Sequence, residues 1–227
     1  MEEKNKTKDP INQPAILLED KQGLEKLGLM NSVVWYDDPK RLVFTLSRYK
    51  FVAKMLSGKN TVVEIGCGDG FGARIVKQEV NQLTITDYDP YFIKRFKDIY
   101  SDKWPITAIE HNILEGPLMD RFDAVYSLDV MEHMHTDQEK IYIRNIIDSV
   151  NDNGVVIIGM PSLESQPYAS PGSKEGHVNC KSGKDFKDLM EKFFANVFLF
   201  SMNDEVVHTG FEKMAHYLLV LCCGIKK

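Results

Sequence analysis

Cysteine is scarce in this sequence and forms no metal-binding or redox pattern. The 227 residues contain four cysteines, at positions 67, 180, 222 and 223. None belongs to a C-x-x-C motif, and no cysteine–histidine spacing typical of a zinc site is present. We therefore expect reduced thiols and no metal site.

Long apolar runs and excess positive charge are absent as well. The longest C-terminal apolar run, Tyr217 to Cys223, is too short to cross a bilayer, and the N-terminal stretch MEEKNKTKDP has no apolar signal region. These features predict a cytoplasmic protein without a membrane partner. The formal net charge of −5 gives no broad basic field for counterion release, so we expect no nucleic-acid partner.

The length indicates one sizeable domain, because 227 residues are few for two catalytic domains. Residues 1–22 are polar and are expected to form a flexible N-terminal arm. Residues 23–227 are expected to form a single domain that begins with a helical cap. Within the cap, apolar residues between Asp38 and Met55 recur at helical spacing. The oligomeric state is left open between monomer and homodimer.

Strand and helix patterns alternate through the rest of the chain, which predicts a parallel sheet with right-handed crossovers. The last two strands, 196–202 and 216–223, have no room for a crossover helix between them and should be antiparallel. The earlier strands are expected at 61–65, 83–86, 106–109, 122–128 and 155–159, with helices at 71–79, 91–99, 138–150 and 184–194.

The strongest motif is a β-branched strand that runs into four alternating glycines, VVEIGCGDGFG, at Val62–Gly72. Glycines let the backbone turn sharply and approach a ligand, and the next helix offers free N–H groups. Nineteen residues after Gly68, Asp87 ends the second strand, where a carboxylate can accept hydrogen bonds from ribose hydroxyls. Asp89 is interpreted as a helix cap. The glycines also fit the dinucleotide pattern G-x-G-x-x-A, so a nicotinamide cofactor remains an alternative.

In order, the segments VVEIGCGDG, TDYDP, EHNIL, FDAVYSLDVMEHM and GVVIIGMPS resemble the motifs of class I S-adenosylmethionine-dependent methyltransferases. The similarity is greatest to the small-molecule branch that includes ubiquinone-biosynthesis enzymes, and it covers roughly residues 40 to 223. It implies an α/β, Rossmann-like sheet of seven strands in the order 3-2-1-4-5-7-6, with the last strand antiparallel and helices on both faces. It also implies S-adenosyl-L-methionine as cofactor and S-adenosyl-L-homocysteine as product.

The resemblance also implies roles for particular residues. Asp87 would bind the ribose, and Leu128 and Asp129 would pass close to the sulfonium. Arg48 could pair with the cofactor carboxylate, although a solvated helix-face arginine is an alternative. Glu132 and His133 are typical of the family here, but capping and packing explain them as well as chemistry. The remaining cofactor-binding candidates are Glu64, Gly66 and Gly68 near the methionine part, Asn112 and Ile113 at the adenine, and Cys67 and Tyr88 beside these residues in the sequence.

Acceptor sites in this family are built from two variable loops, here 161–179 and 203–214. The first is rich in Ser, Pro and Gly, is expected to be without regular structure, and carries His177. The second places Asp204 four residues before His208. Either histidine could act as general base with a carboxylate to orient it, although each could instead be a structural residue. We rank His177 before His208.

The sequence therefore predicts methylation of a small molecule, by analogy an oxygen of a sugar or sugar-phosphate-like acceptor in bacterial surface-glycan or secondary metabolism. Two alternatives remain open. One is a nicotinamide-dependent oxidoreductase, and the other is a non-catalytic protein that binds S-adenosylmethionine.

Overall fold

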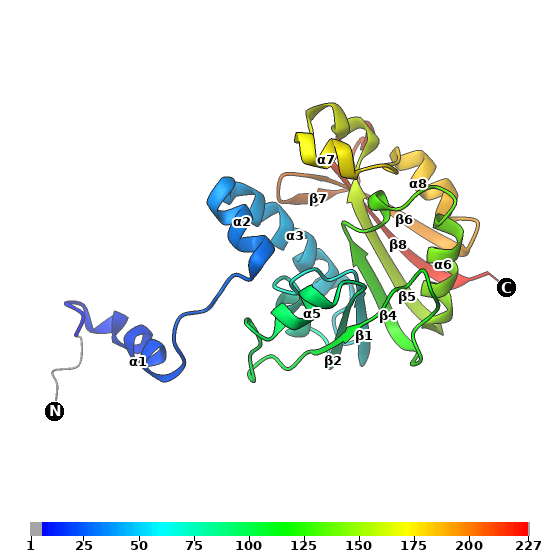
Figure 1. The fold of residues 1–227 in the computed structure, drawn as a ribbon. Coiled ribbons are helices and arrows are strands. Elements are labelled where there is room, and N and C mark those ends of the chain that lie inside the picture. Colours follow the sequence, from blue (N-terminus) through cyan, green and yellow to red (C-terminus); the bar gives the residue numbers. More distant parts are fainter. Residues whose placement is uncertain (1–5, 227) are drawn as a thin grey trace.

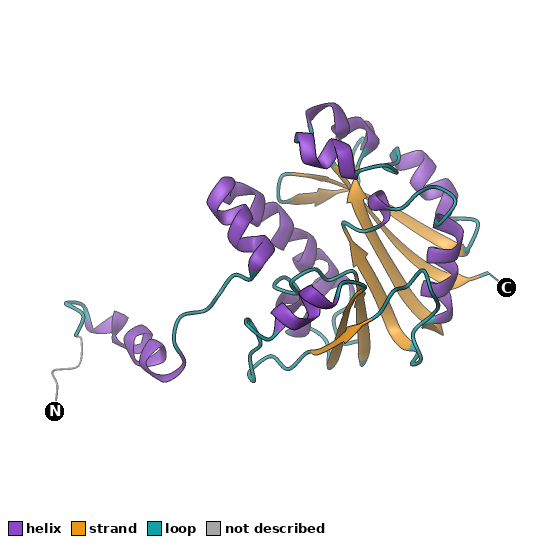
Figure 2. Ribbon diagram, viewed as in Figure 1, coloured by secondary structure: helices purple, strands orange, loops and turns teal. Residues whose placement is uncertain are grey.

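A computed structural model describes residues 6–226, and these form one sheet with helices on both of its faces (Figures 1 and 2). The sheet has eight strands in the order β3-β2-β1-β4-β5-β8-β6-β7. The strands are β1 Thr61–Ile65, β2 Gln82–Asp87, β3 Thr107–Glu110, β4 Phe122–Leu128, β5 Val150–Pro161, β6 Phe194–Asn203, β7 Val206–His208 and β8 Tyr217–Ile225. The α-helices are α1 Gln13–Gln22, α2 Leu29–Asp37, α3 Pro39–Met55, α4 Ala73–Lys77, α5 Pro90–Phe96, α6 Glu139–Asp148, α7 Pro171–Gly176 and α8 Gly183–Met190.

Strand pairing confirms the predicted order for seven of the strands. β1 pairs in parallel with β2 and β4, β2 with β3, and β4 with β5. β8 is antiparallel to both β5 and β6, as the short connection predicted. The prediction was one strand short, because β7 forms a hairpin with β6 inside the segment 203–214. A three-residue edge strand is too brief to produce a clear alternation in the sequence.

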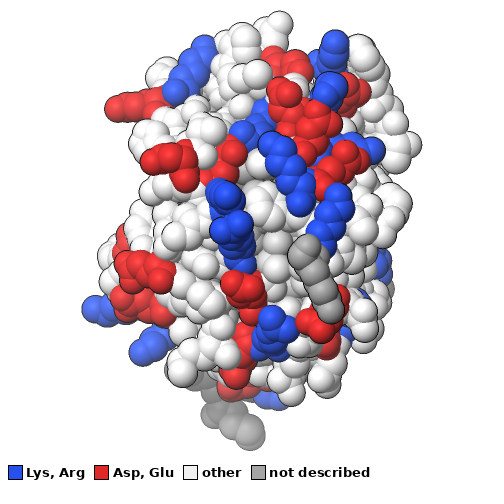
Figure 3. Space-filling model, turned by 90° about the vertical axis from the view of Figure 1, so that its right-hand side faces the viewer, with Lys and Arg blue, Asp and Glu red and all other residues white. Residues whose placement is uncertain are grey.

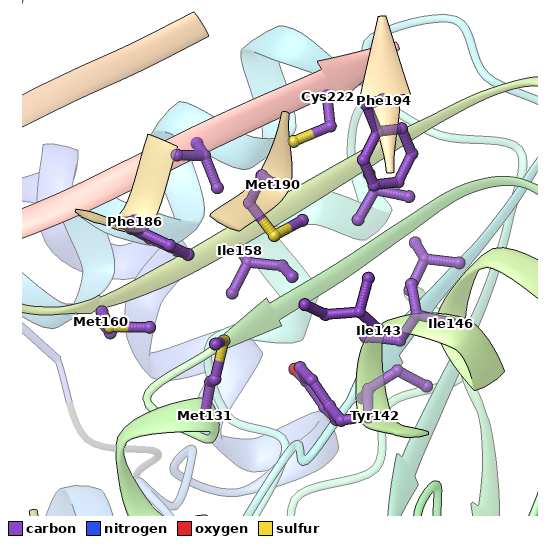
Figure 4. Close-up of a cluster of buried hydrophobic side chains, with 14 of the residues drawn as sticks. Met131, Tyr142, Ile143, Ile146, Ile158, Met160, Phe186, Met190, Phe194 and Cys222 are labelled. Carbon is purple, nitrogen blue, oxygen red and sulfur yellow. The ribbon is translucent and has the colours of Figure 1, made fainter. Parts of the chain in front are cut away.

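Two apolar clusters hold the helices against opposite faces of the sheet. Successive side chains of a strand point to opposite faces, so Val125 of β4 joins one cluster while Ala124 and Tyr126 join the other. The first cluster, drawn in Figure 4, packs the sheet against α6 and α8 through residues such as Tyr142 and Phe186. The second packs it against α3, α4 and α5.

The segment 161–179 is not the structureless loop that its composition predicted. It contains the 3-10 helix η3, Leu163–Tyr168, followed by α7. Each helix begins at a serine whose side chain accepts a backbone hydrogen bond, Ser162 for η3 and Ser170 for α7. Ser170 is followed by Pro171, a residue favoured in the first turn, so serine and proline start helices here.

The N-terminal region is more helical than its composition indicated. Residues 1–5 of the predicted arm lie outside the described residues. The rest of the arm forms the 3-10 helix η1, Pro10–Asn12, and α1, neither of which buries a residue; α1 lies apart from the sheet (Figure 1). The predicted division into an arm of 1–22 and a domain of 23–227 stays a prediction. Within residues 6–226, no helix is both long and apolar enough to span a membrane.

The difference in burial predicts that substituting two isoleucines will change the free energy of unfolding by very different amounts. Ile158 of β5 is 1% exposed, whereas Ile141 of α6 is 47% exposed. Ile158→Ala should lower the free energy of unfolding by about 2–5 kcal/mol, because it removes buried contacts and leaves a cavity. Ile141→Ala, the matched control, should change it by less than about 0.5 kcal/mol. Urea denaturation followed by circular dichroism measures both, and equal losses would contradict the assignment of the core.

Candidate active site at the carboxyl ends of the strands

The glycine loop after β1 turns sharply beneath the end of β2. Gly66, Gly68 and Gly70 have φ angles of 75°, 53° and 71°, which disfavour residues with a Cβ atom. The backbone N–H groups of Gly66 and Cys67 donate to the carbonyl of Thr86 at 2.8 and 2.9 Å. A Cβ atom at Gly66 would lie 2.3 Å from Val130, whereas one at Gly68 would meet no atom within 4 Å. Gly68 therefore presents its backbone to open space, where a ligand can approach closely.

Asp87 at the end of β2 is fixed beside this loop. Its Oδ2 accepts from the backbone N–H of Gly68 at 2.8 Å, and its Oδ1 accepts from that of Asp89 at 3.0 Å. Burial raises the pKa of Asp87, and the backbone hydrogen bonds oppose that shift. The predicted capping role of Asp89 is confirmed, since its Oδ1 accepts from the N–H of Tyr91 at 2.8 Å.

A hollow of about 500 Å³ lies next to Asp87, beyond the ends of β2 and β3. Tyr88 and Asn112, both predicted cofactor residues, line it together with His111. The Asn112 amide nitrogen donates to Glu115 at 2.9 Å, so the side chain is held at the rim. Ile113 is 4% exposed and belongs to the apolar core, and it is not among the residues that line this hollow.

Glu64, the residue predicted to line the methionine part, lies buried below the glycine loop. Its Oε1 accepts from the hydroxyl of Tyr49 on α3 and its Oε2 from that of Tyr126 on β4, each at 2.8 Å. Burial raises the pKa of Glu64 to about 8, although both hydrogen bonds lower it. Glu64 therefore joins the cap helix to two central strands. Cys67 beside it is also buried in the core.

Asp129 directly follows β4 and pairs with Arg48 of α3. Nη1 of Arg48 donates to both Asp129 oxygens, at 2.9 and 2.7 Å, and the guanidinium lies 3.8 Å from the ring centre of Tyr217. The Arg48 side chain is 15% exposed, so it is not the solvated helix-face arginine of the alternative reading. Its predicted pairing with a cofactor carboxylate remains a prediction. Asp129 has a φ of 57°, an uncommon backbone conformation typical of functional sites, and Leu128 before it is buried.

Glu132, three positions after Asp129, lies close to His133 and His177. We call these three residues the Glu132 cluster. Glu132 and His133 lie in the 3-10 helix η2, Met131–His133, and His177 directly follows α7. The rings of His133 and His177 have their centres 5.2 Å apart. Burial raises the pKa of Glu132 well above its usual range, and the charge of Asp129 adds to the shift. Burial and the neighbouring His133 lower the pKa of His177.

The other predicted histidine lies in a different environment. Nε2 of His208 donates to the amide oxygen of Asn203 at 2.8 Å, and its Nδ1 accepts from the N–H of Gly210 at 2.9 Å. Both ring nitrogens are thus engaged within the β6–β7 hairpin. Asp204 has a φ of 48° at the tip of this hairpin, and the residue that orients His208 is Asn203 rather than the expected Asp204. Of the two predicted bases, only His177 joins residues that follow β4.

The methyltransferase domain family matches residues 37–197, which is most of the chain. The chain belongs to this family. The match confirms the predicted resemblance at the level of the family, and it covers the cap helix α3, the glycine loop, Asp129 and the Glu132 cluster. The geometry agrees with a cofactor-binding fold: Gly68 is open to a ligand, Asp87 offers a carboxylate, and a hollow begins at Tyr88, the residue after Asp87.

The chain is also similar to curated relatives and to solved structures. It is 27% identical over 119 residues to a Mycobacterium tuberculosis protein named "Probable S-adenosylmethionine-dependent methyltransferase", covering 51% of this chain and 42% of that protein. It is 26% identical over 102 residues to a tRNA U34 carboxymethyltransferase of Shewanella pealeana, covering 43% and 30%. The chain thus spans less than half the length of these relatives. The N-methyltransferase NodS of Bradyrhizobium japonicum, solved with S-adenosyl-L-homocysteine, shares the fold with a TM-score of 0.61 at 15% identity, over 84% of this chain and 90% of that one.

The buried carboxyl of Glu64 predicts an unusual dependence of stability on pH. Because its pKa rises from 4.5 to about 8 on folding, its protonated form stabilises the fold fully below pH 4.5, and that contribution is lost as the pH rises to about 8. Glu64→Gln keeps a partner for both tyrosines and does not ionise. The free energy of unfolding of Glu64→Gln relative to the natural protein should therefore rise between pH 5 and pH 8, by an amount on the order of a few kcal/mol.

Urea denaturation at several pH values, without added cofactor, measures this difference. The control is Glu79→Gln, because Glu79 is a carboxylate at the surface whose pKa is lowered by its hydrogen bonds from Lys54 and Ser57. Its difference from the natural protein should not rise with pH. A flat profile for Glu64→Gln would show that Glu64 is ionised in the folded protein at neutral pH.

Proposed function

We propose that this protein binds S-adenosyl-L-methionine at the glycine loop and transfers its methyl group to an oxygen of a small, sugar-like or sugar-phosphate-like molecule. The observation that carries the proposal is the position of His177. Segment 161–179 returns its last residues to the end of β4, where the N–H of Asn179 donates to the carbonyl of Glu132 at 3.0 Å. A group that can accept a proton therefore lies in the crevice where ligands of open α/β sheets bind.

The cofactor supplies an electrophilic methyl group on a sulfonium. Asp87 and the backbone of Gly68 would hold the ribose side, and the hollow lined by Tyr88 and Asn112 would take the adenine. Asp129 and the Glu132 cluster then border the acceptor. A hydroxyl must lose its proton as its oxygen attacks the methyl carbon, whereas a neutral amine attacks without prior deprotonation. Proton-accepting groups at this position favour an oxygen acceptor.

Charge and shape favour a small acceptor over a nucleic acid. The net charge is −5, and on the face viewed in Figure 3 the acidic and basic side chains are interspersed without a basic field. The arrows of β4 and β5 point toward α7 (Figure 1), so segment 161–179 lies over the carboxyl ends of the strands, as a lid on a small-molecule site does. Because relatives named as tRNA-modifying enzymes match part of the chain, RNA is an outcome that the experiment below must include.

Cofactor binding is tested by substituting two aspartates that lie close together in the sequence, Asp87 and Asp89. Asp87→Ala should weaken the binding of S-adenosyl-L-homocysteine about tenfold to a hundredfold, since it removes a charged hydrogen-bond acceptor from the ribose. Asp89→Ala removes only a helix cap and should keep the affinity of the natural protein. Isothermal titration calorimetry measures both.

The same titration with NADH distinguishes the dinucleotide alternative. Binding of NADH without binding of S-adenosyl-L-homocysteine would overturn the proposal in favour of an oxidoreductase. Equal affinities for the two variants would remove Asp87 from the cofactor site.

Methyl transfer is tested with methyl-labelled S-adenosyl-L-methionine and three acceptor pools: a polar metabolite extract, the total RNA and the total protein of the source cells. Mass spectrometry should find label in a hydroxylated small molecule. His177→Ala should lower the transfer rate about a hundredfold or more, because a positioned proton acceptor contributes that much. His208→Ala is the matched control and should retain the rate.

Label in RNA or protein alone would overturn the small-molecule assignment. Binding of S-adenosyl-L-homocysteine without label in any pool would favour the non-catalytic alternative. Equal rates for the natural protein and His177→Ala would remove His177 from the chemistry.

A further inference from the structure

Glu132 carries a buried carboxyl group whose hydrogen-bonding capacity is unused. Its side chain is 0% exposed, and within residues 6–226 neither Oε1 nor Oε2 has a hydrogen-bond partner. A polar group taken out of water without a partner costs about 1–3 kcal/mol, and a charged one costs more. A buried polar group without a partner in a native structure indicates that a ligand or ion is missing, and the side chains around it indicate the chemistry of that ligand.

Two imidazole rings lie beside this carboxyl group. One ligand atom from each of Glu132, His133 and His177 lies within 4.8 Å of the other two. Nε2 of His133 is 4.0 Å from Oε1 of Glu132. Nitrogen and oxygen ligands lie about 2.0–2.2 Å from a zinc ion, so two ligands of one tetrahedral ion are separated by about 3.3–3.6 Å. Approach of these side chains by about an ångström would bring the three atoms around one ion.

Both histidines are oriented by hydrogen bonds to their other ring nitrogen. Nδ1 of His133 lies 3.0 Å from the carbonyl oxygen of Gly176, and Nδ1 of His177 lies 3.0 Å from the amide oxygen Oε1 of Gln166. Because both partners are acceptors, each Nδ1 carries the proton and each Nε2 keeps its lone pair. Metal-ligating histidines almost always have such a partner, which fixes the tautomer and the ring.

The donor set narrows the class of ion. Two imidazoles and one carboxylate suit divalent first-row transition metals such as Zn²⁺ and Mn²⁺, and three protein ligands leave positions open for water or a substrate. The sequence predicted no metal site, because metal-binding motifs are recognised by cysteines and histidines that lie close together in the sequence. Here 44 positions separate His133 from His177, and the segment containing η3 and α7 brings them together.

We infer that Glu132, His133 and His177 bind one divalent transition-metal ion, which holds the acceptor hydroxyl beside the methyl group. The second part of this inference rests on the proposed function. As a Lewis acid, the ion lowers the pKa of the bound hydroxyl, which loses its proton to water. The oxygen then bonds to the methyl carbon, the carbon–sulfur bond breaks, and S-adenosyl-L-homocysteine leaves. With the ion bound, His177 promotes loss of the hydroxyl proton through the metal, whereas without the ion its Nε2 accepts that proton directly, as in the proposed function.

Metal binding is tested without any acceptor. Full-length protein stripped with a chelator is titrated with Zn²⁺ and, separately, with Mn²⁺ by calorimetry, and electron paramagnetic resonance measures free Mn²⁺. One equivalent of at least one ion should bind. Glu132→Gln and His177→Ala should each weaken that binding about tenfold or more. The control is His135→Ala, an exposed histidine two residues after His133, which should bind the ion like the natural protein.

The titration with S-adenosyl-L-homocysteine, run on the same samples, shows that each variant is folded and separates the two proposals. Because the side chain of His177 lies near the surface, His177→Ala remains informative even where Glu132→Gln fails to fold. Bound S-adenosyl-L-homocysteine with no stoichiometric Zn²⁺ or Mn²⁺ would overturn the metal site and leave the proposed function standing. Unchanged metal affinity in His177→Ala would also overturn it. Stoichiometric metal without any cofactor binding would support the site and contradict the proposed function.

Discussion

Parallel pairing of β1 with β2 and β4 brings the chemical groups of this protein to one edge of the sheet. The registers Glu64–Ile85 and Glu64–Tyr126 align the three strands, so the residues that follow them meet in space although they are far apart in sequence. This alignment brings the glycine loop, Asp87 and Asp129 to the same end of the three strands. In open α/β sheets, ligands bind in the crevice outside the carboxyl ends of the strands.

Several ionisable groups lie at this edge, among them the buried Glu64 and Glu132 and the half-buried Asp129. Glu64 is held by two tyrosines and Asp129 by Arg48, whereas the carboxyl group of Glu132 has no hydrogen-bond partner among the described residues. Buried ionisable groups lower stability unless they are paired, and such groups mark functional sites more often than structural ones. The two apolar clusters on the faces of the sheet supply the stability that offsets this cost.

The periodic parts of the fold could be predicted from the sequence, whereas the assembly of the acceptor side could not. The β-branched run at 61–65 indicated its strand, and the glycines that follow it, together with Asp87, indicated the cofactor edge. The prediction that segment 161–179 has no regular structure was wrong, because Ser170 caps helix α7 and Pro171 lies in its first turn. No sequence pattern links Glu132 to His177, since their proximity depends on how that segment folds back over β4. The pairing of Arg48 with Asp129, 81 positions apart, is likewise a tertiary contact.

A crystal structure of the protein with S-adenosyl-L-homocysteine tests the central claim most directly, since it locates the cofactor relative to β4. The account predicts ribose hydroxyls within hydrogen-bond distance of the Asp87 carboxylate, adenine in the hollow beside Asn112, and the sulfur directed toward Asp129 and the Glu132 cluster. A ligand bound elsewhere, or one whose sulfur faces away from the end of β4, would contradict it.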